Sequence, residues 1–237
     1  MSNVTKLACL DGVKRIGDDK SRPKVSDTHM TIGIDVSSSM SQFSQYNIIN
    51  SINNLIDDQM LNSNVLVKNS MTVIKFGTDV TVVYNRVNLN EIPRLQYSDI
   101  EPNGSTSLYD AIGLGLNTFR DDEENMFMIM TDGHENTSKK ETKSSIQTKI
   151  GEAITKKCLV KYLGGGYDAI RIGVDMGFPE SCCLTFTNCD EGFKNAIHSV
   201  SSSLSRHRSN GNHAFTGLER VSSIQPVIQR AGRLQRV

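Results

Sequence analysis

Small oxygen-bearing side chains gather at three places in this sequence, each next to a hydrophobic segment. These places are Asp35-Val36-Ser37-Ser38-Ser39, Gly104-Ser105-Thr106 and Thr131-Asp132-Gly133. Carboxylate and hydroxyl oxygens are hard ligands, which suit Mg²⁺, Mn²⁺ or Ca²⁺ better than soft metals. The candidate ligands of one divalent cation are therefore Asp35, Ser37, Ser39, Thr106 and Asp132.

Such a ligand set would leave the coordination of the cation incomplete. Mg²⁺ prefers about six oxygens and keeps several waters, whereas two carboxylates and three hydroxyls supply fewer. An Asp or Glu of another protein can fill the open position. We therefore expect partner recognition rather than catalysis, with Mg²⁺ as the first candidate and Mn²⁺ or Ca²⁺ as alternatives.

The elements around these loops must bring them together. Residues 30–36 and 126–130 are short apolar runs, which predict buried strands that end at the first and third loops. Apolar residues recur at spacings of three and four over 48–60 and 108–119, which predicts amphipathic helices. In an α/β sheet, loops at the carboxyl ends of the strands line the crevice where ligands bind.

The alternation of strands and helices predicts the fold class. It is typical of a Rossmann-like, doubly wound and mostly parallel sheet with helices on both faces. Residues 71–76 and 80–84 flank a short turn that contains Gly77, which predicts a hairpin with one antiparallel edge strand. Asp35 and Asp132 should then lie at the ends of neighbouring strands.

At these residues the chain resembles the von Willebrand factor A (vWA) family. The metal-ion-dependent adhesion site (MIDAS) of that family is written D-x-S-x-S, then a distant Thr, then a distant Asp in a T/S-D-G sequence. All five positions are matched, by Asp35, Ser37, Ser39, Thr106 and Asp132. The resemblance implies a vWA domain over residues 28–205, a bound divalent cation, and a protein partner that presents an Asp or Glu to it.

Two positions differ from the adhesion-receptor form of the motif. Val36 and Ser38 stand where those receptors often have Gly. The sequence is more similar to intracellular bacterial and viral members of the family, a similarity that extends to Lys-Tyr-Leu-Gly-Gly-Gly-Tyr-Asp-Ala at residues 161–169. The resemblance therefore implies a binding module in an intracellular complex.

Each candidate ligand also has a structural interpretation that needs no metal. Asp35, Ser37 and Ser39 could form a turn and cap the following helix, because Asp and Ser side chains hydrogen-bond free backbone amides there. Thr106 could cap the helix predicted over 108–119 in the same way.

Three nearby polar side chains have less certain roles. His134 and Glu135 follow Asp132 and could contact a partner or a metal-bound water. Asp110, behind Thr106 on the predicted helix, fits a local salt bridge better than a metal ligand. We therefore keep these three residues out of the predicted ligand set.

Gly164, Gly165 and Gly166 suggest an alternative function, because a glycine-rich turn before a helix can cradle a phosphate. A nucleotide-binding or hydrolytic α/β protein would use this turn. The fuller fingerprints, a G-x-G-x-x-G after the first strand and a Walker lysine, are missing. No G-x-S-x-G motif surrounds Ser37 or Ser39, which argues against a Ser-His-Asp hydrolase. A binding module, not an enzyme, is the preferred interpretation.

Composition restricts the partners and the compartment. The 26 basic and 26 acidic residues cancel, so net charge gives no reason to expect nucleic acid or an anionic membrane surface as a partner. Five irregularly spaced cysteines favour reduced thiols. The longest apolar run covers only residues 126–130, which predicts neither a signal peptide nor a transmembrane segment. We expect a cytoplasmic protein.

The two ends of the chain differ from its centre. Residues 1–27 show no sustained period and predict an irregular leader. Residues 206–237 are rich in arginine and predict a basic tail that could contact an acidic partner or nucleic acid. Within this tail, apolar residues at 227, 228, 231 and 234 could form one short helix after Pro226.

Overall fold

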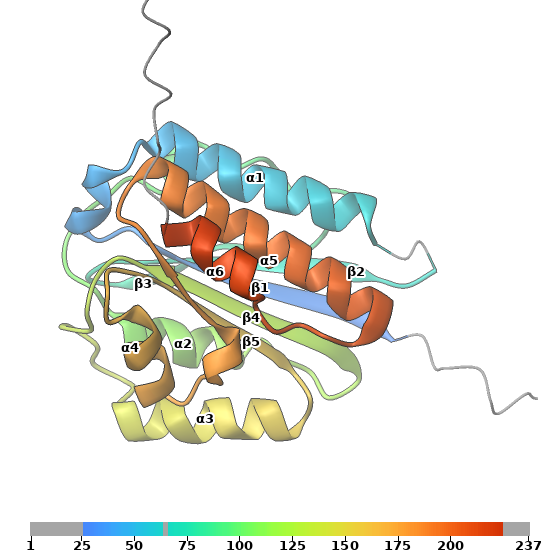
Figure 1. Ribbon diagram of the computed structural model, residues 1–237. Helices are drawn as coiled ribbons and strands as arrows, with labels where there is room; N and C mark the ends of the chain where they lie inside the picture. The colour runs from blue at the N-terminus through green and yellow to red at the C-terminus, as the bar shows by residue number, and fades with distance from the viewer. Residues whose placement is uncertain (1–25, 64–65, 225–237) are drawn as a thin grey trace, which may run out of the picture.

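Six strands form one sheet in the computed structural model, which describes residues 26–63 and 66–224 (Figure 1). The strands are β1 (Asp27–Asp35), β2 (Asn69–Phe76), β3 (Val80–Asn88), β4 (Glu123–Thr131), β5 (Leu159–Gly165) and β6 (Cys183–Phe186). Their order across the sheet is β3-β2-β1-β4-β5-β6. Only β3 runs antiparallel to its neighbour, which confirms the predicted hairpin and the mostly parallel sheet.

The central strands are buried on both faces, as their continuous apolar sequences predict. The last seven residues of β1 and of β4 are all buried. These two strands are parallel neighbours, with Ile34 paired to Met130. Their carboxyl ends therefore lie side by side.

Helices cover both faces of the sheet (Figure 1). One face carries α1 (Gln45–Leu61) and α5 (Asp190–Asn210), with α6 (Gly217–Ile224) beside α5. The other face carries α2 (Leu108–Leu116), α3 (Lys143–Thr155) and α4 (Ala169–Asp175). Short 3-10 helices occupy η1 (Ser38–Gln42), η2 (Tyr97–Asp99) and η3 (Glu180–Cys182). Each face has its own hydrophobic core, so the predicted doubly wound α/β architecture is confirmed.

The folded part of the chain extends beyond the boundary predicted at residue 205. Helix α5 continues past residue 205 to Asn210, where Gly211 adopts a left-handed conformation with φ of 77°. Arg206 pairs with Glu219 of α6 at 2.6 Å, and Arg208 donates to Gln59 of α1. Residues 206–224 therefore pack on the sheet domain, because Arg208 reaches α1 and Ser223 of α6 donates to the backbone O of Thr185 in β6. The rest of the predicted tail, including its short helix, and the leader up to residue 25 lie outside the described residues.

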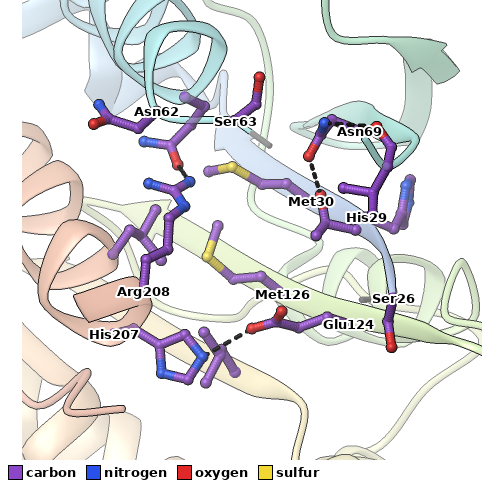
Figure 2. A pocket seen from close by; sticks show the side chains of 15 residues that line it. Ser26, His29, Met30, Asn62, Ser63, Asn69, Glu124, Met126, His207 and Arg208 are labelled. Carbon is purple, nitrogen blue, oxygen red and sulfur yellow. Dashed lines mark hydrogen bonds and ion pairs between the residues drawn. The ribbon is translucent and has the colours of Figure 1, made fainter. Parts of the chain in front are cut away.

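A cavity of about 560 Å³ opens at the amino end of the sheet (Figure 2). Met30 and Met126 line it from the sheet, and Arg208 and the hydrogen-bonded pair of His207 and Glu124 line it from the sides. This cavity lies at the end opposite the loops that follow β1 and β4. In the described part of the chain, no helix has the length and apolar character needed to cross a membrane.

Candidate metal centre

The predicted ligands lie where the connections of the sheet diverge. After β1 the chain turns to α1 on one face, whereas after β4 it turns to α3 on the other face (Figure 1). In doubly wound sheets, ligands bind in the crevice that such a switch creates at the carboxyl ends of the strands. Asp35 is the last residue of β1, and Asp132 follows the last residue of β4.

Asp35 is a buried carboxylate with only neutral donors around it. Its Oδ1 accepts a 2.6 Å hydrogen bond from the backbone N–H of Ser37, and its Oδ2 accepts one from the hydroxyl of Thr131. Burial raises the pKa of Asp35 to about 6; the bonds from Thr131 and Ser37 oppose this rise, and the charge of Asp132 adds to it. Asp35 therefore carries its negative charge at a cost that a nearby cation would relieve.

The first and third loops are joined by a chain of hydroxyls. Ser37 Oγ lies 3.0 Å from Ser39 Oγ, and Ser39 Oγ donates to Asp132 Oδ1 at 2.6 Å. The side-chain amide of Gln42 donates to the other oxygen of Asp132 at 2.5 Å. In the described residues, every hydrogen bond to Asp35 and Asp132 thus comes from an uncharged donor.

Gly133 leaves a space that oxygens from different loops surround. A Cβ atom built on this glycine would lie 3.2 Å from Thr106 Oγ1, 3.7 Å from Ser39 Oγ and 3.8 Å from Asp35 Oδ2. A side chain at position 133 would therefore occupy the space toward which these oxygens converge. The structure brings all five predicted side chains together here, Ser37 and Asp132 through their hydrogen bonds to Ser39.

The donor set fits a hard divalent cation that also takes water or a partner's oxygen. Two acidic side chains contribute, and no three His, Cys, Asp or Glu side chains cluster anywhere in the described parts of the chain. The fit therefore depends on the hydroxyls of Ser37, Ser39 and Thr106. Oxygen ligands of this kind suit Mg²⁺ and its relatives, which tolerate neutral oxygens and retained waters.

Of the alternative structural roles, the turn is observed for Asp35, whose Oδ1 accepts the backbone N–H of Ser37, whereas helix capping by Ser37 and Thr106 is not. Ser37 precedes η1 and makes no side-chain capping bond to it. The N-cap of α2 is Ser107 rather than Thr106, and it also lacks a side-chain capping bond. Capping therefore does not explain the hydroxyls of Ser37 and Thr106.

Asp110 and Glu135 both bond to backbone N–H groups near the site, which was not predicted for either residue. Asp110 makes no local salt bridge, because its carboxylate instead accepts the backbone N–H groups of residues 139–141 at 2.7 to 2.9 Å. Glu135 is directed toward Tyr109 and Ser138, whose backbone N–H groups it accepts at 2.9 Å and 2.7 Å. Both carboxylates thus hold the loop after Asp132 against the start of α2.

Sequence reasoning assigned no role to two residues of the centre, Thr131 and Gln42. The hydroxyl of Thr131 donates to Asp35, and the amide of Gln42 donates to Asp132. The T/S-D-G pattern around Asp132 was a signal for Thr131. Nothing in the sequence indicated Gln42, because its partner is 90 residues away.

The glycines at the end of β5 have a packing role in this structure. A Cβ on Gly164 would lie 2.6 Å from the Cβ of Ala169, and one on Gly165 would lie 2.1 Å from Asn188 Oδ1. The latter would also lie only 3.1 Å from the Cα of Asp132. These glycines therefore let β5 pack closely behind the third loop.

No protein-family model matches the sequence, and no curated protein shows significant sequence similarity to it. Proximal thread matrix protein 1 from the mussel byssus, solved with a zinc-occupied MIDAS motif, has a similar structure. Its TM-score is 0.54 at 14% identity, and the match covers 73% of this chain and 46% of that one.

Two bacterial pilus proteins also have similar structures. The pilus adhesin SpaC from Lactobacillus rhamnosus GG has a TM-score of 0.60 at 10% identity, covering 77% of this chain and 30% of that one. The PilB minor pilin from Streptococcus sanguinis has a TM-score of 0.57 at 11% identity, and the match covers 77% of this chain and 62% of that one. Each match spans less than two thirds of the other protein. At such identities the similarity concerns the fold alone: a part of each of these proteins is folded like the described part of this chain.

Proposed function

We propose that this chain is a divalent-cation-dependent protein-binding domain. The ion, with Mg²⁺ as the first candidate, would be held by Asp35, Ser37, Ser39, Thr106 and Asp132 and would bridge to an Asp or Glu of a partner. The observation that carries the proposal is the convergence of oxygens from the first two loops on the space beside Gly133 of the third, with Asp132 joined to them through Ser39.

The charges of the site support a cation more than a catalytic role. Asp35 is 1% exposed, and its burial is not offset by any described Lys, Arg or His within ion-pair distance. When bound, a divalent ion would supply the missing positive charge and attract a further carboxylate. That attraction is worth several kcal/mol in a partly desolvated site, before desolvation costs are subtracted. Asp35 and Asp132 would hold the ion, while the three hydroxyls would orient it.

The structural neighbours support the proposal at a coarser level. The mussel protein holds zinc in its MIDAS motif, and SpaC is a pilus adhesin. For this chain we propose an intracellular binding role instead, because its described cysteines at 158, 182, 183 and 189 are all free thiols.

Metal-dependent capture tests the proposed function. The full chain would be immobilised and exposed to host extract in Mg²⁺ or in chelator, beside the variants Asp132→Asn and Asp175→Asn. Asp175 is a matched control, because it is an exposed aspartate on α4 that pairs with Lys143. We expect a partner that wild type and Asp175→Asn retain in Mg²⁺, and that chelator and Asp132→Asn both release. A partner retained equally in chelator and by Asp132→Asn would contradict the proposal.

A further inference from the structure

Asn136 connects the loop that carries Asp132 to the loop that carries Thr106. Its backbone N–H donates to Thr106 O at 3.1 Å, and its side-chain Oδ1 accepts the backbone N–H of Thr106 at 2.9 Å. The peptide groups on both sides of the Thr106 side chain are thereby bound to one residue. Asn136 is only three residues after Gly133, beside which the candidate ligands converge.

Glu135 fixes the segment from which Asn136 makes these bonds. Its carboxylate accepts backbone N–H groups from Tyr109, Thr137 and Ser138, and also the hydroxyl of Ser138 at 2.7 Å. Tyr109 belongs to the first turn of α2, so this carboxylate links the segment to that helix. The position of Asn136 is therefore determined by bonds that do not involve the candidate ligands.

The opposite side of the Thr106 loop is held by Thr78, in the turn between β2 and β3. Thr78 Oγ1 accepts the backbone N–H of Ser105 at 3.0 Å, and Thr78 O accepts the hydroxyl of Ser107 at 2.7 Å. These bonds hold the neighbours of Thr106, whereas Asn136 holds Thr106 itself. A loss of the Asn136 side chain would thus free the backbone N–H of Thr106, whose hydroxyl oxygen lies nearest to the space beside Gly133.

We propose that Asn136 is a positioning residue for the divalent cation, keeping the Thr106 hydroxyl directed at the space beside Gly133. This inference rests on the proposed function, because it assigns a role only if the centre binds a cation. Asn136 acts through Thr106 and is not itself a ligand. Groups that orient metal ligands commonly change metal affinity by about tenfold or more when removed.

The chemistry of this contact allows a conservative rescue. The bond to Thr106 needs an acceptor at the position of Asn136 Oδ1, which an aspartate supplies and an alanine does not. Asn136 is an exposed residue, so alanine there leaves no cavity in the core. A change in metal affinity can therefore be separated from a change in folding.

Calorimetric titration of Mn²⁺ and Mg²⁺ into the full chain tests the inference, with thermal unfolding in chelator measured in parallel. We expect Asn136→Ala to weaken cation binding about tenfold with little change in the unfolding temperature of the metal-free protein. We expect Asn136→Asp to bind at least as tightly as wild type. Asn47→Ala is the matched control, since the Asn47 amide donates to Asp190 at 2.6 Å and touches none of the candidate ligands.

The outcomes separate this inference from the function on which it rests. If wild type binds neither cation, the proposed function and the positioning role are both wrong. If wild type binds and Asn136→Ala binds equally well, only the positioning role is wrong. The positioning role is also wrong if Asn136→Ala loses affinity, Asn136→Asp fails to restore it, and both variants unfold at correspondingly lower temperatures in chelator.

Discussion

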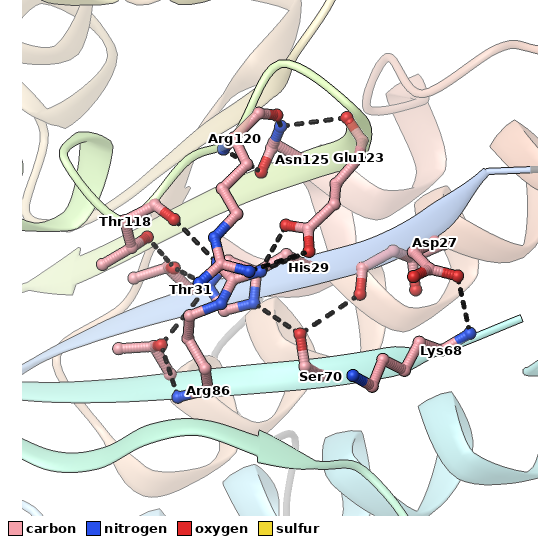
Figure 3. Close-up of polar contacts among 12 residues, drawn as sticks. Asp27, His29, Thr31, Lys68, Ser70, Arg86, Thr118, Arg120, Glu123 and Asn125 are labelled. Carbon is pink, nitrogen blue, oxygen red and sulfur yellow. Dashed lines mark hydrogen bonds and ion pairs between the residues drawn. The ribbon is translucent and has the colours of Figure 1, made fainter.

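Two carboxylates at opposite ends of the same sheet have different surroundings, although Asp35 is buried and the Glu123 side chain is only 9% exposed. Glu123 begins β4 at the amino end, and its carboxylate pairs with the guanidinium of Arg86 beside His29 (Figure 3). Asp35 ends β1 at the carboxyl end and receives hydrogen bonds only from neutral groups among the described residues. The chain itself supplies the counter-charge of Glu123, whereas no charged donor among the described residues bonds to Asp35. Uncompensated buried charge is therefore what distinguishes the candidate centre from a structural polar network.

The polar side chains around Glu123, those of Arg86, Arg120 and His29, also have partners within the chain. Arg86 donates to the backbone O of Thr118 at 2.8 Å, and a second guanidinium, that of Arg120, lies 3.9 Å from Glu123. His29 lies within 2.8 to 3.3 Å of the hydroxyls of Ser70, Thr31 and Thr72. This end of the sheet needs no external ion.

The largest expected effect follows from breaking the Glu123 pair. Arg86→Met leaves the largely buried carboxylate of Glu123 without its main counter-charge, so we expect a loss of about 3 kcal/mol in the free energy of unfolding. Urea unfolding at pH 7 measures it. Arg94→Met is the control, because the exposed pair of Arg94 and Asp57 should contribute less than about 1 kcal/mol. Equal losses for the two variants would contradict the comparison.

His29 should make the same end of the sheet sensitive to acid. Burial, with the nearby charges of Arg86 and Arg120, lowers the pKa of His29 from 6.5 to about 4. The unfolded chain therefore binds a proton between pH 6.5 and 4 that the folded chain does not. The neutral imidazole of His29 makes its full contribution to the free energy of unfolding above pH 6.5. That free energy should fall by up to about 3 kcal/mol as the pH drops from 6.5 to 4.

Urea unfolding between pH 7 and pH 4 checks this prediction against His29→Gln. The variant lacks the titrating ring, so its stability should decline less steeply over this range. Parallel curves for wild type and variant would show that His29 does not titrate as its surroundings imply.

A smaller effect of opposite sign is expected at Asp35. In chelator at pH 7, Asp35→Asn removes a buried charge and should raise the free energy of unfolding by about 1–2 kcal/mol. The hydroxyl of Thr131 can then accept from the new amide and donate to Gly133 O, which lies 3.2 Å away. Added Mg²⁺ should stabilise wild type but not this variant. If Asp35→Asn instead destabilised the protein in chelator, as we expect for Arg86→Met, Asp35 would have a structural role like that of Glu123, and the comparison would be contradicted.

The fold and the meeting of the candidate ligands could be predicted because both follow local patterns. Short apolar runs predicted the strands, and apolar residues at spacings of three and four predicted the helices. The order of the loops then predicted that Asp35 and Asp132 lie at the ends of neighbouring strands. Contacts between distant segments had no such pattern. Gln42 reaches Asp132 across 90 residues, and Asn136 meets Thr106 across 30.

The C-terminal region could not be predicted for a related reason. Its arginines looked solvated in the sequence, because Glu219 and Gln59 become their neighbours only after folding. Ser223 of α6 likewise donates to the backbone O of Thr185 in β6 at 2.7 Å. No periodic pattern in the sequence predicts this contact. Helix α6 therefore appeared only in the structure.

The most direct test of the central claim is calorimetric titration of Mg²⁺ into the metal-free chain, beside Asp35→Asn and Thr106→Val. These variants change a carboxylate and a hydroxyl from different loops with almost no change in volume. We predict saturable binding of one ion by wild type, abolished in Asp35→Asn and clearly weakened in Thr106→Val. Absence of binding by wild type, or binding that neither substitution weakens, would contradict the assignment of a metal centre to these loops.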